Sequence, residues 1–194
     1  MNPADLIAPL RSRLGSRFDE HGHIGLTVLR EVKIRRATEG DSDEVWSIFK
    51  AVIAPGDTYA FDSDMSRADA MDYLYSDDTS TYVAESAGRI VGIYFIRANQ
   101  PGLGSHIANA GFMVWPGAQR TGIGRKMAEH CLEEARRLGF CGIQFNFVVS
   151  TNQTAISLWK SLGFSVVGTV PGAFRHSTEG IVDVLIMFRK LTEE

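Results

Sequence analysis

The stretch WPGAQRTGIGRKMAEHCLEEARRLGF, residues 115–140, joins a glycine-rich turn to a long helical pattern. Glycines at positions 117, 122 and 124 let the backbone turn tightly and approach a ligand closely. At the N-terminus of the following helix, unpaired N–H groups point outward and the helix dipole favours negative charge. The sequence therefore predicts an anion-binding site at this turn.

Two common phosphate-binding motifs do not fit this turn. A P-loop requires G-x-x-x-x-G-K-[ST], but Ile123 occupies the lysine position. A dinucleotide fingerprint requires G-x-G-x-x-G, but Met127 occupies the position of the third glycine. The remaining pattern is Q-x-x-G-x-G at residues 119–124, whose successive N–H groups can surround a diphosphate. Nearby basic residues add positive charge: Arg120, Arg125 and Lys126.

The whole chain has the composition of an ordinary globular protein, with 194 residues, 44% of them hydrophobic and 22% charged. A net charge of −3 gives no general attraction to nucleic acid or to an anionic membrane, so neither partner is predicted. The two cysteines, Cys131 and Cys141, have neither metal-ligand spacing nor a disulfide pattern. We therefore predict a cytoplasmic protein without a metal site.

The N-terminal residues 1–30 precede the main pattern and are expected to form an extension. Charged residues interrupt any apolar run there, so the start does not resemble a signal peptide. Residues 3–14 fit a short amphipathic helix with Leu6, Leu10 and Leu14 on one stripe. Residues 31–194 are expected to form a single domain.

Hydrophobic periodicity along that domain predicts an α/β mixture with seven strands and four helices. The predicted strands are residues 32–38, two strands within 81–99 joined at Ala87–Gly88, 106–114, 142–150, 164–170 and 180–191. The predicted helices are 39–54, 67–75, the helix after the glycine-rich turn, ending at Gly139, and 152–162. The segment PGAFRH, residues 171–176, is expected to be a loop.

These motifs, taken together, resemble the GNAT acetyltransferases. The family signature Q/R-x-x-G-x-G/A follows its fourth strand, as residues 119–124 do here. Val114-Trp115-Pro116 precede the turn as the family's V-x-P does. The family's N-x-x-A-x-x-L-[Y]-x-x-x-G-F segment is matched by Asn152, Ala155, Leu158, Gly163 and Phe164.

The resemblance implies a GNAT fold, with a mixed sheet of about seven strands, splayed fourth and fifth strands and about four flanking helices. It implies acetyl-CoA as cosubstrate, with the pantetheine arm between the splayed strands and the diphosphate in the turn. The cofactor-binding residues would then be Met113, Val114, Gln119, Arg120, Thr121, Gly122, Ile123, Gly124, Arg125, Asn152 and Trp159. Trp159 replaces the tyrosine that usually protonates the departing thiolate, and an indole cannot serve as that acid.

The acceptor amine is expected where the splayed strands open. Candidate substrate-binding residues are Tyr59, His106, Asn109, Asn146, Phe147 and Arg175, and the candidate catalytic residues are Asn109, Asn146 and His176. A carboxylate base is missing from residues 106–114, which leaves a water-mediated base, His106 or His176.

Residues 146–173 also resemble the fungal N-acetyltransferases that act on L-azetidine-2-carboxylate and related proline analogues, through N-x-x-A-x-x-L-W and the following V-P-G-A. That resemblance implies substrate binding by Asn146 and Phe147. We therefore predict an N-acetyltransferase for the primary or secondary amine of a small molecule such as an amino acid. Acetylation of a protein lysine or N-terminus, and a non-catalytic coenzyme A-binding module, are the alternatives. Many relatives are dimers, so a homodimer is one expected assembly.

Overall fold

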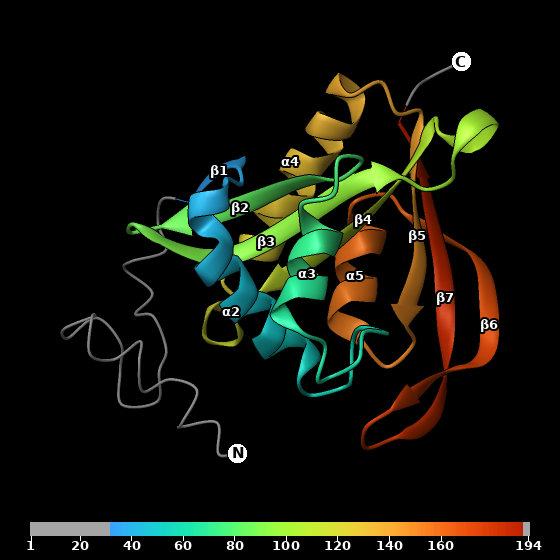
Figure 1. The fold of residues 1–194 in the computed structure, drawn as a ribbon. Helices are drawn as coiled ribbons and strands as arrows, with labels where there is room; N and C mark the ends of the chain where they lie inside the picture. Colours follow the sequence, from blue (N-terminus) through green and yellow to red (C-terminus); the bar gives the residue numbers. More distant parts are fainter. Residues whose placement is uncertain (1–31, 192–194) are drawn as a thin grey trace.

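The computed structural model describes residues 32–191, which form one mixed sheet with helices on both faces (Figure 1). The strands are β1 (Lys33–Arg36), β2 (Ser80–Ser86), β3 (Arg89–Ala98), β4 (Ile107–Val114), β5 (Gly142–Val149), β6 (Ser165–His176) and β7 (Gly180–Lys190). The helices are α2 (Ser42–Ile53), α3 (Arg67–Leu74), α4 (Ile123–Arg137) and α5 (Gln153–Ser161). The sheet order is β1-β2-β3-β4-β5-β7-β6, so the predicted seven strands and four helices are confirmed. The expected extension, residues 1–30 with its short helix, lies outside the described residues.

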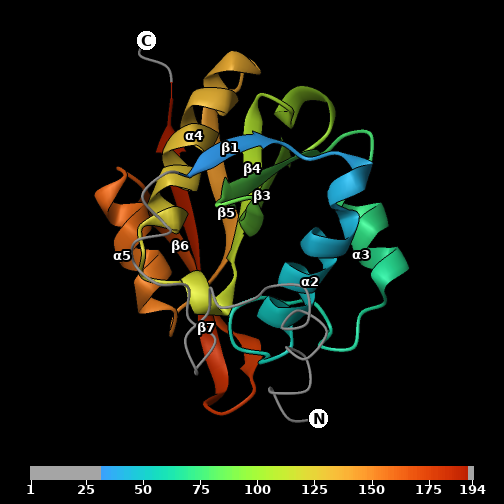
Figure 2. The same ribbon diagram turned by 90° about the vertical axis from the view of Figure 1, so that its left-hand side faces the viewer.

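Helices cover opposite faces of the sheet, as Figure 2 shows, and a hydrophobic core lies beneath them on each face. Helices α2 and α3 cover one face, where Val45, Ile48 and Phe49 are buried as their helical spacing predicts. Helices α4 and α5 cover the other face, where Met127 of α4 is fully buried. Strands β2 to β4 are thus covered on both faces, whereas most side chains of β6 are exposed.

Strands β4 and β5 begin as neighbours and then separate. Their parallel register within residues 32–191 consists of Ile107 opposite Gly142 and Ala108 opposite Ile143. Both strands continue for about six further residues, to Val114 and Val149, without being paired to each other. The sheet is therefore split at the C-terminal ends of these two strands, as the prediction of splayed fourth and fifth strands requires.

The turns largely follow the predicted chemistry. Ala87 and Gly88 both have positive φ, which is the geometry of a tight hairpin between β2 and β3. Gly139 follows α4 with φ of +84° and ends the helix in the left-handed conformation. Asp41 stands at the N-cap position of α2, but its carboxylate accepts hydrogen bonds from Arg35 and Thr38 instead of capping that helix.

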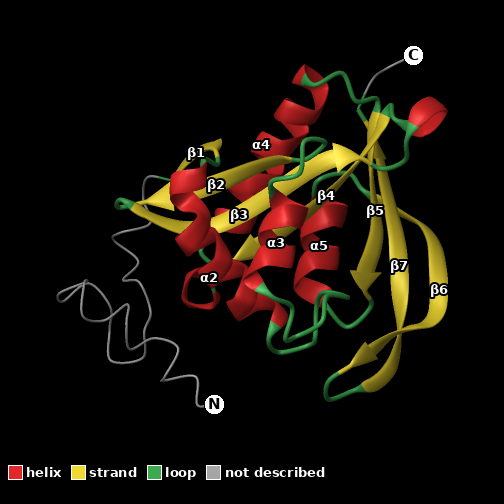
Figure 3. Ribbon diagram, viewed as in Figure 1, coloured by secondary structure: helices red, strands yellow, loops and turns green. Residues whose placement is uncertain are grey.

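The expected loop at residues 171–176 is wrong, because β6 continues through this segment to His176 (Figure 3). The pairing is irregular there, with Val170 opposite Val184 and Phe174 opposite Val182. Pro171 has no N–H to donate, and an outer strand tolerates that loss because one of its edges is unpaired. The long β6–β7 hairpin that results carries Arg175 and His176.

Candidate active site

The glycine-rich turn has the backbone conformation of an anion site. Arg120 and Gly122 both have positive φ, at +61° and +88°, so the chain reverses sharply before α4. The Thr121 hydroxyl donates to the Ala118 carbonyl at 2.6 Å and braces the turn. Lys126 N–H is the first to bond within the helix, to the Gly122 carbonyl, so the N–H groups of residues 122–125 have no partner within α4. These groups and the helix dipole face the turn together.

Arg125 is held beside this helix start by α5. Its guanidinium donates to the Ser161 hydroxyl at 2.7 Å and lies 3.7 Å from the Glu129 carboxylate. The neighbouring helix therefore fixes a positive charge near the exposed N–H groups. Gln119 and Arg120 are exposed on the outer side of the turn.

The unpaired edge of β4 exposes alternate backbone groups. Trp115 N–H donates to the Val91 carbonyl of β3, and Asn99 N–H donates to the Ile107 carbonyl. The β3–β4 register is regular between these bonds, so the odd-numbered residues of β4 face β3. The backbone groups of Phe112 and Val114 consequently face the split between β4 and β5. Met113, by contrast, directs its backbone to β3 and buries its side chain in the α2–α3 core.

Tyr59 reaches the same edge from the loop after α2. Its hydroxyl donates to the Phe112 carbonyl at 2.7 Å and accepts from the Phe112 N–H at 2.9 Å. Burial raises the pKa of this phenol above its ordinary value, so the group stays protonated across the physiological range. The sequence singled out Tyr59 but missed Phe112. Strand alternation could have indicated Phe112, because backbone groups two residues apart, such as those of Phe112 and Val114, face the same edge of a strand, whereas those of Met113 face the other edge.

Asn152 and Trp159 lie on the other side of the split, on α5. The Asn152 side-chain oxygen accepts from the Ala155 N–H at 3.1 Å and caps the helix. Trp159 is only 7% exposed, and its ring lies 4.9 Å from that of Phe112 and 4.6 Å from that of Phe145. This tryptophan therefore packs directly behind the strand edge that Tyr59 contacts.

The split also exposes an irregular part of β5. Phe145 pairs with Met187 and Val148 with Leu185, so Asn146 and its neighbour Phe147 together oppose one residue of β7. Such a bulge redirects side chains out of the sheet. The Asn146 amide donates to the Asn99 side chain at 2.5 Å and accepts from Gln144 at 2.8 Å. Phe147 is 40% exposed and makes an edge contact with Phe174 of β6, at 5.9 Å between ring centroids.

A family comparison agrees with this geometry. The family model described as "Acetyltransferase (GNAT) family" matches residues 45–164, which include the turn, the split strands and α5. The chain belongs to the GNAT acetyltransferase family. It is therefore an acyltransferase enzyme, and acetyl-CoA is the acetyl donor that this family uses.

Individual relatives of this GNAT enzyme support the assignment. N-acetyltransferase aca1 of Schizosaccharomyces pombe is 34% identical over 151 residues, which cover 69% of this chain and 72% of that protein. A GCN5-related N-acetyltransferase from Kribbella flavida has a TM-score of 0.79 and 38% identity over 82% of this chain and 98% of its own. The [ribosomal protein bS18]-alanine N-acetyltransferase of Escherichia coli K12 is 35% identical over 74 residues, 38% of this chain and 49% of the bacterial protein.

Asn109 lies on the α2–α3 face of the GNAT sheet. Met113 on the same strand points into the α2–α3 core, and the even spacing of four residues directs Asn109 to that face as well. Asn109 stands opposite Arg97 of β3, whose guanidinium donates to the Tyr73 hydroxyl at 2.9 Å. Asn109 is thus three residues, or about 10 Å, along β4 from Phe112.

Arg175 and His176 end the β6 strand of the acetyltransferase. His176 Nδ1 accepts hydrogen bonds from the N–H groups of Thr178 and Glu179, each at 3.2 Å. Nδ1 of His176 is therefore engaged within the turn between β6 and β7. The hairpin is tied to the loop after α2, because Ser177 N–H donates to the Gly56 carbonyl at 3.0 Å. Arg175 itself is exposed.

His106 is not brought to the open end of the split. Its carbonyl accepts from Cys141 N–H at 2.8 Å, at the closed end where β4 and β5 begin as neighbours. Its imidazole contacts the Leu103 carbonyl at 3.2 Å in the exposed loop before β4. Six residues of extended strand separate His106 from Phe112, which is about 20 Å. The prediction that His106 lies at the opening therefore needs correction.

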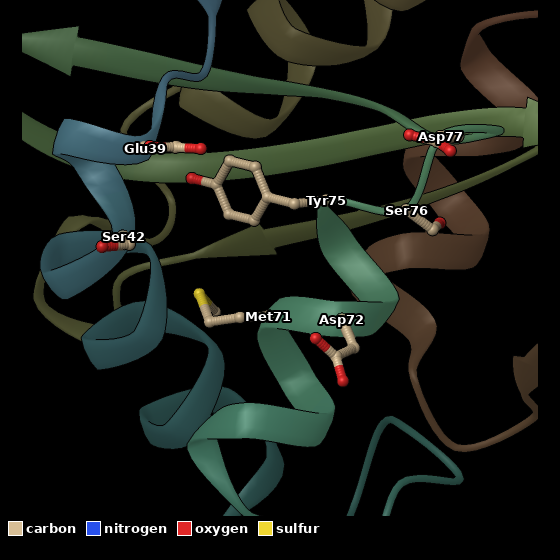
Figure 4. A pocket seen from close by; sticks show the side chains of 7 residues that line it. All are labelled: Glu39, Ser42, Met71, Asp72, Tyr75, Ser76 and Asp77. Carbon is tan, nitrogen blue, oxygen red and sulfur yellow. The ribbon is translucent and has the colours of Figure 1, made fainter.

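An acidic groove lies at the other end of the α2–α3 pair (Figure 4). Its cavity volume is about 570 Å³, and it is lined by Glu39, Ser42, Met71, Asp72, Tyr75, Ser76 and Asp77. Ser42 begins α2, whereas the Tyr59 loop follows the end of this 12-residue helix, about 18 Å away. The groove is therefore separate from the split between β4 and β5.

Within residues 32–191, no three histidine, cysteine or acidic side chains gather as a metal site would require. No helix in this part of the chain is both long and apolar enough to span a membrane. Cys131 is buried, and this burial raises the pKa of its thiol.

Proposed function

We propose that this GNAT enzyme transfers the acetyl group of acetyl-CoA directly to the primary or secondary amine of a small molecule, such as an amino acid or an analogue of one. The observation that carries the proposal is the split sheet. It exposes the backbone edge of β4 beside a turn with free N–H groups, and an amide-bearing bulge lies across the opening.

The described residues fit acetyl-CoA. The N–H groups at the start of α4 suit a diphosphate, and Arg125 supplies positive charge beside them. A Cβ at Gly124 would meet Leu158 and Val114 at 3.7 and 3.9 Å, which are ordinary van der Waals distances, so the fold itself does not require glycine here. Residues proposed to hold the cofactor are Val114, Gln119, Arg120, Thr121, Gly122, Ile123, Gly124, Arg125, Asn152 and Trp159, with Met113 contributing through packing.

When bound, acetyl-CoA supplies the activated acyl group. N–H groups on the open edge of β4 would polarise its carbonyl in a region that α5 and Trp159 shield from water. Trp159 donates no proton, so the thiol, whose pKa is near ~8.5, leaves as a thiolate or is protonated by solvent. Amide side chains such as those of Asn109 and Asn146 are not bases, so we propose that water removes the proton of the amine.

We assign the acceptor amine to the region around Asn146. Asn109, Asn146, Phe147, Arg175 and Tyr59 would position it, and Asn109 and Asn146 would serve catalysis by orienting the amine, not as bases. The Asn146 side chain reaches from β5 across the split to the side chain of Asn99, to which it donates at 2.5 Å. The resemblance of residues 146–173 to azetidine-2-carboxylate acetyltransferases favours a small amine. We further propose that the enzyme is cytoplasmic and forms a homodimer.

Acetylation of a protein is the second candidate. The similarity to ribosomal-protein alanine acetyltransferases favours it, and the acidic groove would attract a basic peptide. However, the groove lies at the far end of α2 from the opening, so a single extended peptide would have to follow the whole helix to reach both.

Free-thiol release from acetyl-CoA tests these alternatives when it is measured across amino acids, proline-ring analogues, polyamines and basic peptides. Acceleration by one small amine is the expected result. Acceleration by peptides alone would support protein acetylation, and bound acetyl-CoA that no acceptor turns over would contradict the catalytic proposal.

A further inference from the structure

The hydroxyl of Tyr59 occupies the place on β4 where an acyl oxygen would bind. It lies 2.9 Å from the Phe112 nitrogen and accepts that N–H, while its own proton is directed to the Phe112 carbonyl at 2.7 Å. Phe112 is central among the residues on the unpaired edge of β4, and a ligand lying along this edge must use the same two backbone groups. The Tyr59 oxygen therefore accepts from the Phe112 N–H the same hydrogen bond that a thioester oxygen would accept there.

We propose that Tyr59 is a catalytic residue whose hydroxyl donates a hydrogen bond to the acyl oxygen during acetyl transfer. The inference rests on the proposed function, because it concerns the acyl group of acetyl-CoA. On binding, the acyl oxygen takes the position at the Phe112 N–H, and the phenol retreats by about one hydrogen-bond length, ~3 Å. Two donors, Phe112 N–H and Tyr59 O–H, then converge on one oxygen.

The electron movements of the step are complete with these two donors. The amine lone pair forms the C–N bond, and the carbonyl π pair moves to the oxygen that Tyr59 and Phe112 hold. This pair then re-forms the carbonyl as the C–S bond breaks, so sulfur leaves with its bonding electrons. The amine proton passes to water. Tyr59 keeps its proton throughout, and the upward pKa shift that burial causes agrees with a role as donor and not as acid.

The surroundings of Tyr59 limit how far its hydroxyl can move. Its ring stacks on Phe61 at 5.8 Å, and Phe61 contacts Phe49 of α2 and Tyr73 of α3, each at 5.1 Å. This aromatic cluster anchors the loop on the α2–α3 core. The β6–β7 hairpin holds the same loop at Gly56 through Ser177. Once acetyl-CoA is bound, this packing would hold the displaced hydroxyl against the acyl oxygen, so its reorganisation belongs to the binding step and not to acetyl transfer.

Trp159 supplies no hydroxyl group to this edge of β4. It packs against Phe112 from the α5 face and offers no hydroxyl to the reacting group. Among the described side chains, Tyr59 is the one with a recorded hydrogen bond to the backbone of Phe112.

The test compares Tyr59→Phe with Tyr75→Phe. Tyr75 is a matched control outside the site, since its hydroxyl also donates to a backbone carbonyl, that of Thr38 at 3.2 Å. Calorimetry without acceptor measures the affinities of acetyl-CoA and S-ethyl coenzyme A, which lacks the acyl oxygen. We expect the wild type and Tyr75→Phe to prefer acetyl-CoA by about fivefold, and Tyr59→Phe to lose this preference. With an acceptor, kcat of Tyr59→Phe should fall about 100-fold with little change in the KM for acetyl-CoA.

An unchanged preference for acetyl-CoA in Tyr59→Phe would overturn the inference, and so would a lost preference with an unchanged kcat. Both results leave the acetyltransferase proposal intact, because the wild type still turns over. A wild type that binds acetyl-CoA but acetylates no acceptor refutes the proposed function instead. The binding preference still decides whether Tyr59 contacts the acyl oxygen in that case. Thermal unfolding of both variants checks that each is folded.

Discussion

At the scale of single residues, substitutions at Gly124 test acetyl-CoA binding without disturbing the fold. Its Cβ position is free of close contacts, so Gly124→Ala should fold and retain acetyl-CoA binding. Gly124→Glu places a negative charge where the diphosphate is proposed to lie, and we expect its affinity for acetyl-CoA to fall at least ~100-fold. Calorimetry on both variants measures this difference. Equal binding by Gly124→Glu and the wild type would remove the turn from the cofactor site.

Asn146 separates acceptor binding from cofactor binding. Its amide is exposed on the bulge of β5 and contacts Asn99 and Gln144. Asn146→Ala should raise the KM for the acceptor about tenfold, because a hydrogen bond to a charged or polar substrate is lost, and leave the KM for acetyl-CoA nearly unchanged. Asn99→Ala is the control, since it removes a partner of Asn146 but not the group that would contact substrate. An acceptor KM that Asn146→Ala does not change would exclude direct contact.

At the scale of elements, Asp41 joins β1 to the start of α2. Its carboxylate accepts two hydrogen bonds from Arg35 at 2.8 Å and one from the Thr38 N–H at 2.7 Å. The Arg35 guanidinium is the main cause that holds the pKa of Asp41 well below its usual range. The carboxylate therefore stabilises the fold fully at pH values above its ordinary pKa of about 4. This contribution is lost as the pH falls through the lowered pKa of the folded state.

Asp41→Asn should accordingly lower the free energy of unfolding by about 2 kcal/mol at pH 7, and the difference from wild type should shrink below about pH 4. Urea unfolding across this pH range measures both values. Asp43→Asn is the control, because the Asp43 side chain is 86% exposed in its ion pair with Arg67 and should contribute almost nothing. A constant difference down to pH 2 would contradict the assigned ion pair.

The elements also show why sequence patterns predicted the fold better than the site. The strands and helices follow from periodicity and from glycines such as Gly88 and Gly139, whose positive φ ends an element. The continuation of β6 through Pro171 was missed because a proline reads as a break, whereas an outer strand tolerates it. The roles of Phe112 and His106 depend on strand register and on where β4 and β5 separate, and these are long-range properties that local patterns do not contain.

At the scale of the whole molecule, the split separates β4 from β5 at one end of the sheet, and the α4–α5 core contacts the strands on both sides of the split. A ligand in the split would contact β4, the turn, α4 and α5 together, so its binding free energy should stabilise the complete domain. At 100 times its dissociation constant, acetyl-CoA should add about 2.7 kcal/mol, which corresponds to roughly 5–10 °C in the melting temperature of a domain of this size.

Differential scanning fluorimetry measures this shift, with the Gly124→Glu variant as the control that should gain at most about 0.4 kcal/mol. Coenzyme A without the acetyl group should produce most of the shift, because the turn and the strand edge bind parts that coenzyme A and acetyl-CoA share. The acyl oxygen of acetyl-CoA adds one hydrogen bond at Phe112.

Amide hydrogen exchange then locates the residues that acetyl-CoA protects. Protection at Phe112 and Val114, without a change at Met113, is expected from the alternation of β4. Protection that is equal at all three residues would contradict the proposed position of the ligand along this edge.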